Sequence, residues 1–245
     1  MRAAPVSRIV AEQNAFLRLL SDEALETLRP SLELIDLETD AGVGLPPRLA
    51  DGFHFPIDGV LAVVRDARGG DGGFVRFVGR DSFVRIDVRS DFRDVLVVGS
   101  GRGLRAPGSA MWSIIERRPD WGGWAFEIGR LRNAVSMVNI ACTASHSYRE
   151  RVARLLVEAR AAFPSARIVP FTHQQLSELI ATRRETVSLV MGELARERMI
   201  AVGRGQIEIL DAALLERAAC RCCRETRAIE ERTRALARDF FAPHP

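Results

Sequence analysis

Two adjacent arginines begin the segment of this sequence that is richest in chemical information. Arg183 and Arg184 precede apolar residues at helical spacing, namely Val187, Val190, Met191 and Leu194. Cations in the first turn of a helix oppose its dipole, at a cost of ~0.3–1 kcal/mol per charge. A phosphate or a guanine edge would offset that cost, and a guanidinium can donate two parallel hydrogen bonds to either. The pair therefore predicts contact with nucleic acid.

Further side chains fall on the same outward face when Val187 is placed at the buried centre of the helix. Leu189 suits the methyl group of thymine, and Glu185 could accept a hydrogen bond from a cytosine amino group. Glu185 has a second interpretation, because it also matches a helix-capping pair with Thr182. The predicted DNA-binding residues are Thr172, Gln174, Thr182, Arg183, Arg184, Glu185, Thr186, Ser188, Leu189 and Arg204.

Two short helices would position these side chains. Thr172 with Gln175, and Thr182 with Glu185, match the reciprocal cap that satisfies free N–H groups at a helix start. A tight turn around Ala181 would separate the two helices, which is the arrangement of a helix-turn-helix. The second helix, at about 183–195, would enter a groove of the duplex.

A predicted β-hairpin follows these helices. Residues 200–202, a glycine-containing turn at 203–205 and residues 206–210 have the spacing of a hairpin, the usual wing of a winged helix. Residues 212–240 are expected to form a charged helical tail. Together these elements predict a winged helix-turn-helix domain over residues 165–245.

The first 123 residues have a different texture. Residues 12–30 predict a helix, with Ser21 as an internal cap candidate. Glycine clusters at 69–73 and 99–103 lack the Lys-Ser/Thr of a phosphate-binding loop and are interpreted as hairpin turns. His54 is expected to be an ordinary histidine rather than a haem ligand. The sequence predicts a compact antiparallel β-roll or jelly roll in domain 1–123, with strands at 32–37, 52–55, 59–64, 74–78, 94–98 and 103–106.

A long helix is predicted between these two domains, from Trp124 to Phe163. Its apolar positions alternate steps of three and four residues, as in a coiled-coil seam. We expect domain 124–164 to pair two copies of the chain; the alternative is a helix packed on its own β unit. Pro164 and Pro170 would bracket a hinge. The predicted dimerisation residues are Leu131, Val135, Val138, Cys142, Ser145 and Arg149.

Composition limits the remaining classes of function. The chain has 245 residues and a formal charge of +3, and all of its basic side chains other than histidine are arginine. Because it has no apolar run of membrane-spanning length and no recognisable export signal, we expect a cytoplasmic protein without membrane contact. No nucleophile–base or metal-ligand constellation is recognisable, so neither an enzyme nor a bound cofactor or metal is predicted.

The four cysteines do not resemble a disulfide framework. Cys220, Cys222 and Cys223 lie close together among arginines, which would lower the thiol pKa values and allow redox chemistry or zinc binding. Their spacing lacks both the usual separation of zinc ligands and a fourth ligand. Ordinary helix residues are therefore the preferred interpretation.

The order of these parts resembles the cyclic-AMP-receptor/FNR (Crp/Fnr) family of bacterial transcription regulators, from about residue 14 to 223. The most specific stretch is FTHQQLSELIATRRETVS, and other stretches look like a subgroup of unknown effector. The resemblance implies an α+β fold with a cyclic-nucleotide-binding-like roll. It also implies a homodimer on palindromic double-stranded DNA, with Arg184 and Glu185 touching bases and RNA polymerase as a further candidate partner. The sequence departs from the family at Leu189 and Ala181.

The sensor half resembles the family less. The effector-binding candidates are Phe83, Arg93 and Asp94, where Phe83 stands near the family's ribose-binding glutamate and Asp94 replaces its hydroxyl. A carboxylate beside the phosphate-binding arginine would repel an anion, so cyclic-nucleotide binding is not expected. An iron–sulfur sensor is excluded by the lack of any cysteine before Cys142. Two alternatives remain: a constitutive DNA binder with a decayed pocket, and a protein–protein adaptor that uses the winged helix.

Overall fold

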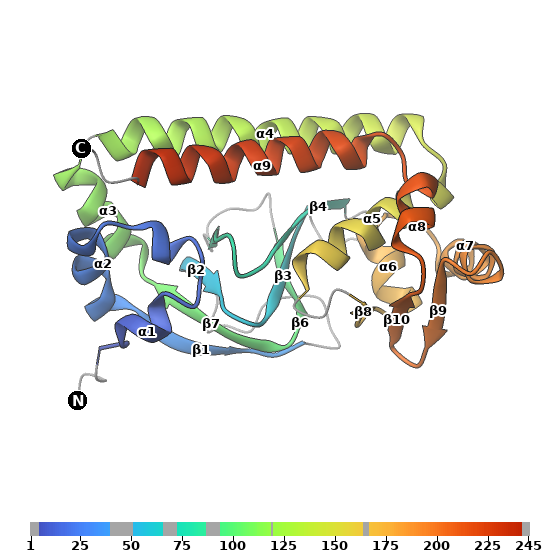
Figure 1. Ribbon diagram of the computed structural model, residues 1–245, viewed down its shortest axis with the longest axis horizontal. Helices are drawn as coiled ribbons and strands as arrows, with labels where there is room; N and C mark the ends of the chain where they lie inside the picture. Colours follow the sequence, from blue (N-terminus) through green and yellow to red (C-terminus); the bar gives the residue numbers. More distant parts are fainter. Residues whose placement is uncertain are drawn as a thin grey trace.

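The computed structural model describes residues 5–39, 51–65, 73–86, 94–118, 120–163 and 167–241 (Figure 1). An N-terminal group of short helices lies at one end of a β-roll, and a winged helix lies at the other. Two long helices run side by side along the roll (Figure 1). The N-terminal helices are α1 (Arg8–Ala11), η1 (Leu17–Leu19), α2 (Asp22–Leu28) and η2 (Arg29–Ser31).

The helix predicted over residues 12–30, with Ser21 as a cap candidate, is confirmed after Ser21 but not before it. Ser21 does cap α2, since its side chain accepts a hydrogen bond from the Ala24 N–H. Upstream, the buried Asn14 side chain accepts from the backbone N–H groups of Phe16 and Leu17 and donates to the Pro56 carbonyl. Because these bonds compete with helical ones, the chain turns at Asn14 instead of continuing as a helix.

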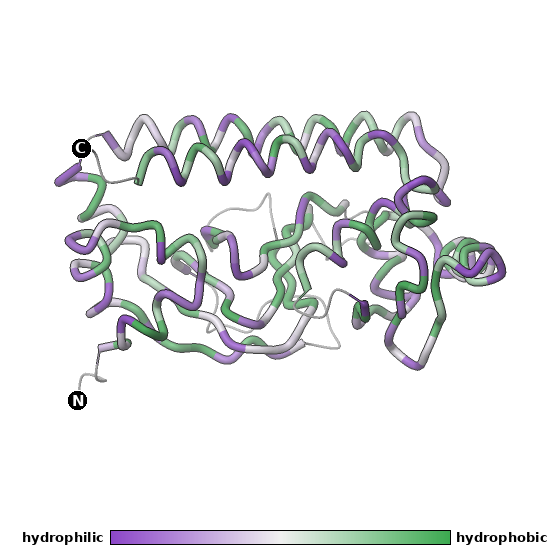
Figure 2. Tube along the Cα trace, in the orientation of Figure 1, coloured by the Kyte–Doolittle hydropathy of each residue, from purple (hydrophilic) through white to green (hydrophobic). Residues whose placement is uncertain are grey.

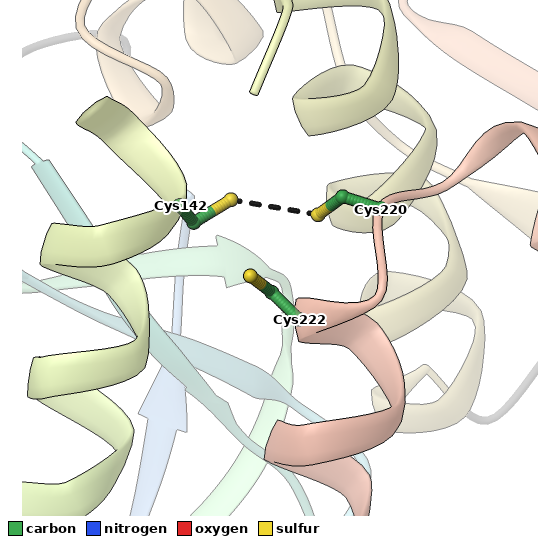
Figure 3. Close-up of side chains that lie close together, drawn as sticks. All are labelled: Cys142, Cys220 and Cys222. Carbon is green, nitrogen blue, oxygen red and sulfur yellow. Dashed lines mark hydrogen bonds between the residues drawn. The ribbon is translucent and has the colours of Figure 1, made fainter. Parts of the chain in front are cut away.

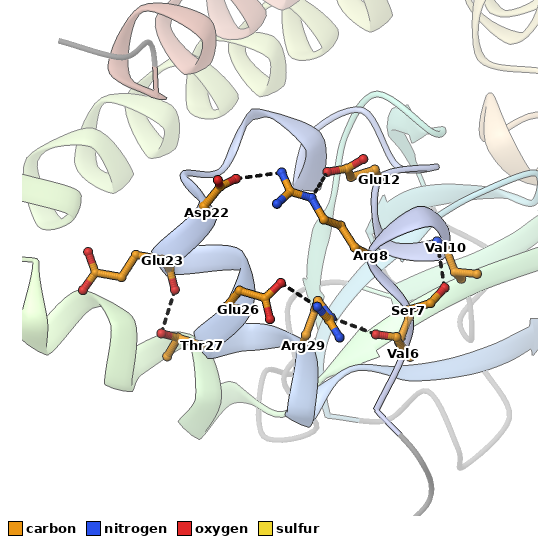
Figure 4. A network of polar contacts seen from close by, with 10 residues as sticks. All are labelled: Val6, Ser7, Arg8, Val10, Glu12, Asp22, Glu23, Glu26, Thr27 and Arg29. Carbon is orange, nitrogen blue, oxygen red and sulfur yellow. Dashed lines mark hydrogen bonds and ion pairs between the residues drawn. The ribbon is translucent and has the colours of Figure 1, made fainter. Parts of the chain in front are cut away.

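Ion pairs hold the short N-terminal helices together (Figure 4). The Arg8 guanidinium lies 2.6 Å from Glu12 and 2.7 Å from Asp22. Arg29 pairs with Glu26 and also donates to the Val6 carbonyl. Arg8 thus links α1 to α2 across a chain reversal.

The β-roll consists of two antiparallel sheets, which confirms the predicted class of fold. One sheet has the strand order β1-β7-β2-β5 and the other β4-β3-β6. The short strand β5 was missed by the sequence analysis. The strands are β1 (Glu33–Leu37), β2 (Gly52–Pro56), β3 (Val60–Arg65), β4 (Gly73–Val78), β5 (Val84–Ile86), β6 (Asp94–Gly99) and β7 (Gly101–Ala106).

The two glycine clusters have different outcomes. Strands β3 and β4 pair as antiparallel neighbours, but most of the predicted turn at 69–73 lies outside the described residues. The predicted hairpin at 99–103 is wrong, because β6 and β7 pair with different sheets and the chain crosses between them at Ser100. A Cβ atom at Gly101 would collide with the backbone of Asp58 and Gly59, so only glycine fits this crossing.

The predicted continuous helix from Trp124 to Phe163 is also wrong. After α3 (Gly108–Arg117), the chain forms α4 (Asp120–Ser145) and α5 (Tyr148–Ala162), which are separated at His146 and Ser147. Ser147 is extended, with φ −65° and ψ 157°, and forms a reciprocal capping box with Glu150. This start signal ends the helical register of α4 and begins a new helix in another direction.

The C-terminal residues form two helices, α8 (Ala212–Ala218) and α9 (Cys222–Phe241), rather than a free tail. Helix α9 runs back along α4 in the opposite direction (Figure 1). At one end of this pair, the rings of Trp121 and Trp124 pack against those of Phe240 and Phe241. No helix in the described residues combines the length and the apolar character needed to cross a membrane.

Other parts of the same chain cover much of the predicted dimerisation seam. Leu131, Val135 and Cys142 are buried, on the side of α4 that faces α9 and the roll. The alternative, a helix packed on its own β unit, is therefore what the structure shows for α4. Along the two helices, green and purple alternate at helical spacing, as expected for amphipathic partners (Figure 2). The remaining seam positions differ: Val138 is half-buried, Ser145 is exposed and Arg149 lies in α5.

Candidate nucleic-acid interface

The predicted winged helix-turn-helix is present. Its sheet has the order β8-β10-β9, and the β9–β10 hairpin forms the wing. Gly205 adopts φ 70° at the hairpin turn, a conformation that favours glycine. The elements are β8 (Ile168–Val169), α6 (His173–Leu179), α7 (Arg184–Arg196), β9 (Ile200–Gly203) and β10 (Gln206–Ile209).

One of the two predicted capping boxes is confirmed and the other is wrong. Thr172 and Gln175 form a reciprocal box at the start of α6. At the start of α7 the cap position is Arg183, with φ −76° and ψ 146° and no side-chain cap bond, rather than Thr182. Glu185 therefore does not close a box with Thr182. Its exposed carboxylate lies in the first helical turn, where the dipole favours an anion and a base could reach it.

The turn between α6 and α7 is tight and is held from outside. Ala181 adopts φ 49°, a left-handed conformation that costs a residue with a Cβ atom more than it costs glycine. Arg151 on α5 donates a hydrogen bond to the carbonyl of Ile180, the residue that ends α6. This bond satisfies a carbonyl at the end of the helix and fixes the angle at which α7 leaves the turn.

The outward face of α7 carries the predicted side chains. Val187 is fully buried, whereas Leu189 is 71% exposed, so the helix is oriented as its periodicity predicts. Arg183, Arg184, Glu185 and Ser188 are exposed, and Thr182 and Thr186 are half-buried. Thr172 and Gln174 on α6 and Arg204 on the wing are exposed as well. The predicted DNA-binding residues are thus accessible on neighbouring elements of one module.

The arginines at the start of α7 and at the tip of the wing differ from Arg167, which forms an ion pair with Glu208 inside the module. Among the described residues, no carboxylate forms an ion pair with Arg183, Arg184 or Arg204. The exposed Ser188 side chain already has a partner in the module: its Oγ lies 2.9 Å from Nδ1 of His173, and this hydrogen bond links α7 to α6. An anion approaching the start of α7 would meet unpaired guanidinium groups together with the positive end of the helix dipole.

Two framework contacts were missed by the sequence analysis. Arg149 on α5 forms an ion pair with Glu197, the residue that ends α7, and lies 3.8 Å from Glu193. Arg151 on the same helix reaches the α6–α7 turn. Both depend on the break between α4 and α5, whose local signal, the capping pair Ser147 and Glu150, the sequence analysis did not use.

The effector candidates have separate fates. The ring centroids of Phe83 and Phe16 are 4.5 Å apart, and the Arg132 guanidinium lies 5.9 Å from the centroid of the Phe83 ring. Arg93 lies outside the described residues, and of Asp94 only the backbone, at the start of β6, is described. His54 is a core residue, as expected, and its burial, together with the nearby Arg105, lowers the pKa of the imidazole to about 4.

A cavity of about 120 Å³ lies between the roll and the helices. Its lining mixes apolar groups with charged ones of both signs, from Arg76, Asp81 and Glu158 to Glu230 and Arg234. The volume could hold a few waters but is small for a nucleotide.

The cysteine pKa values differ from those expected. The Cys220 thiol and Arg154 together lower the pKa of Cys142 to about 5. The hydrogen bond to Cys142 raises the pKa of Cys220, and burial raises the pKa of Cys222. Burial also raises the pKa of Cys223 to about 11. The expectation that neighbouring arginines activate the C-terminal trio is therefore wrong, because the flanking arginines are exposed while the thiols are buried.

Comparison with known proteins identifies the module. Residues 150–218 match the family described as the Crp-like helix-turn-helix domain. Over 44 residues the chain is 48% identical to the cyclic AMP receptor protein of Thermus thermophilus; the match covers 18% of this chain and only 20% of that relative.

Solved structures resemble the whole fold. A Crp/Fnr-family regulator structure from Eubacterium rectale matches 84% of this chain and 98% of its own, at 15% identity and a TM-score of 0.64. FixK2 from Bradyrhizobium japonicum matches 77% and 98%, at 13% identity and a TM-score of 0.62. Fold and module together define a Crp-like regulator with a helix-turn-helix domain for DNA. Residues 150–218 therefore belong to the family of Crp-like helix-turn-helix domains, and the chain as a whole has the fold of the Crp/Fnr-family structures.

Proposed function

We propose that the protein is a homodimeric, sequence-specific transcription regulator that binds palindromic double-stranded DNA through α7. The observation that carries this proposal is the exposed start of α7, where Arg183 and Arg184 have no ion-pair partner among the described residues. Unpaired guanidinium groups at a helix start suit a polyanion that supplies the missing charge.

Individual residues on this face would have different roles. Arg184 would donate to guanine, Glu185 would accept from cytosine and Leu189 would contact a thymine methyl group. Arg183, Thr186 and the wing residue Arg204 would contact phosphates and set the register of the helix. Four further side chains border the same surface and would contact the sugar-phosphate backbone of the DNA, namely those of Thr172, Gln174, Thr182 and Ser188.

Dimerisation would use the outer side of α4 rather than the predicted seam. Phe126, Met137 and Ile140 are 72%, 59% and 64% exposed. They lie on a second stripe of alternating four- and three-residue steps that continues through Arg130, Asn133 and Ala144. Small residues such as Gly129 and Ala141 flank this stripe and would let two helices approach closely. A two-fold axis along α4 would present both α7 helices to neighbouring half-sites.

The roll would not bind a cyclic nucleotide. Phe83, near the ribose-binding position implied by the family resemblance, lies in an aromatic cluster with Phe16, Phe53, Phe55 and Trp124. A ring held by four others leaves no group there to accept a hydrogen bond from a sugar hydroxyl. A regulator bound at a promoter would have RNA polymerase as its next partner.

The proposal is tested by binding to a pool of duplexes at several salt concentrations, combined with sedimentation of the complex. We expect two chains per bound duplex and an affinity that falls steeply as salt rises, because phosphate contacts release counterions. A protein that stays monomeric and binds no duplex at low salt would contradict the proposal. A protein that binds duplex DNA as a monomer would contradict only the proposed dimer and leave the proposed DNA binding intact.

A further inference from the structure

Three thiols from two distant parts of the chain meet at the junction of α4 and α9 (Figure 3). Cys142 lies near the end of α4, Cys220 lies between α8 and α9, and Cys222 is the first residue of α9. The Sγ atoms of Cys142 and Cys220 are 3.5 Å apart, and all three sulfur atoms lie within 4.8 Å of one another. All three residues are buried, and Val138 packs against them.

We propose that Cys142, Cys220 and Cys222 form a binding site for a soft, thiophilic metal or metalloid ion. A metal–sulfur bond of about 2.3 Å places two thiolates about 3.8 Å apart on a tetrahedral ion and about 4 Å apart on a trigonal one. The 3.5 Å between Cys142 and Cys220 is slightly shorter than these values, and no pair of sulfur atoms is more than 4.8 Å apart, so small side-chain rotations would bring the three sulfur atoms to one ion. Figure 3 shows the side chains of Cys142 and Cys220 directed toward each other, with Cys222 beside them.

The donor set selects the class of ion. Within the described residues, neither a histidine nor a carboxylate belongs to this cluster. Thiolate-only sites favour zinc, monovalent copper and comparable soft ions, whereas magnesium and calcium require oxygen ligands. Trivalent arsenic, which bonds three thiolates in a pyramid, has the same preference. Binding is not a redox reaction: with Zn²⁺ or Cu⁺ each coordinating thiol forms a bond from sulfur to the ion and releases its proton to solvent, whereas with arsenite each new arsenic–sulfur bond replaces an arsenic–hydroxyl bond and the thiol proton leaves with that hydroxyl as water.

A buried cation supports the thiolates. The buried Arg154 guanidinium forms a 2.8 Å ion pair with Glu158, and its positive charge favours the thiolate form of Cys142. It also donates to the side chain of Asn139, one turn before Cys142. A positive group held in this way offsets part of the thiolate charge, as hydrogen-bonding partners behind other metal sites do.

Cys223 provides an internal control. It follows Cys222 directly and is equally buried, but it packs into the core shared by α5 and the winged helix instead of the thiol cluster. Removal of its thiol should leave the ion site unchanged.

The position of the site gives it a mechanical consequence. Helix α8, which ends two residues before Cys220, packs on α5 within the Crp-like module. An ion held by all three thiols would therefore fasten the linker after the wing to the end of α4. An effect of this clamp on DNA binding rests on the proposed function, whereas the ion site itself does not.

The test uses the reduced full-length protein titrated with Zn²⁺, Cu⁺ or arsenite, and with Mg²⁺ as a hard-ion control. We expect one equivalent of at least one soft ion to remain after desalting, with a sulfur-to-metal absorption band for Cu⁺ or arsenite. Replacing Cys142, Cys220 or Cys222 by Ser should weaken uptake by at least about tenfold, whereas Cys223→Ser should bind as the wild type does. Circular dichroism identifies folded variants, and Cys→Ala substitutions serve where a buried serine is not tolerated.

Two outcomes would overturn the proposal. One is a folded wild-type protein that retains no soft ion, and the other is a Cys223→Ser variant that loses the ion as completely as the Cys142, Cys220 and Cys222 variants do. DNA affinity of the loaded and ion-free protein is measured in parallel. A protein that takes up the ion but binds no DNA in either state retains the site and loses the proposed function.

Discussion

The guanidinium of Arg149 lies 2.7 Å from the carboxylate of Glu197, which ties the first turn of α5 to the residue that ends α7. The coiled-coil spacing had placed Arg149 in a dimer seam. The helix break at Ser147 instead turns this side chain toward its own DNA-binding module. Both side chains remain partly exposed, so the pair positions α7 more than it stabilises the fold.

Replacing Arg149 by Ala should lower the free energy of unfolding by no more than ~1 kcal/mol and leave the oligomeric state unchanged. Denaturant unfolding and sedimentation velocity measure these two quantities, and Glu197→Ala completes a double-mutant cycle. Dissociation of the Arg149→Ala protein into monomers would instead support the dimer interface that was predicted from the sequence.

Replacing Ile140 by Glu should produce monomers with much weaker DNA affinity, because it places charge on the exposed stripe of α4. Ala228→Glu, on the exposed side of α9, is the matched control and should leave the protein dimeric. Sedimentation equilibrium distinguishes the two variants. An unchanged association state for Ile140→Glu would remove this face as the dimer interface.

The winged helix was predictable because its signals are local. Thr172 and Gln175 are three residues apart, and the apolar period of α7 sets its orientation without any distant contact. The error at Thr182 has a local cause too. Ala181 takes a left-handed conformation, so Thr182 still belongs to the turn and the helix starts one residue later than the motif indicates.

The pairing of α4 with α9 was not predictable from one sequence. A stripe of three- and four-residue steps shows that Leu131 and Val135 face an apolar partner, but not whether the partner is α9, the roll or another chain. The thiol cluster has the same limitation. Cys142 and Cys220 are 78 residues apart, and only the return of α9 along α4 brings them together.

The buried imidazole of His54 should make stability depend on pH. Folding lowers its pKa from 6.5 to about 4, so the unfolded chain binds the proton more readily between these values. Stability from the neutral ring is full above pH 6.5 and declines as pH falls toward 4, by roughly 3 kcal/mol in total. Unfolding across this range for wild type and His54→Gln isolates the effect. Parallel pH curves for the two proteins would contradict it.

Gly192 lies within α7, where a Cβ atom would meet nothing within 4 Å. Gly192→Ala should therefore stabilise the protein by ~1 kcal/mol, because alanine loses less backbone entropy in a helix. Thermal unfolding should show a rise of about 2–4 °C for a chain of this size. A lower unfolding temperature would mean that the helix is not continuous through this position.

The most direct test of the proposed function is selection of bound sequences from random duplex DNA, with wild type and Arg184→Ala compared side by side. Wild type should enrich an inverted repeat with half-sites about one helical turn apart. Arg184→Ala should bind its best site ~1–3 kcal/mol more weakly and lose the preference for guanine at one position of each half-site, while Arg232→Ala on exposed α9 should match wild type. No enrichment by wild type would contradict sequence-specific DNA binding, and an identical consensus from Arg184→Ala would contradict the role of this residue.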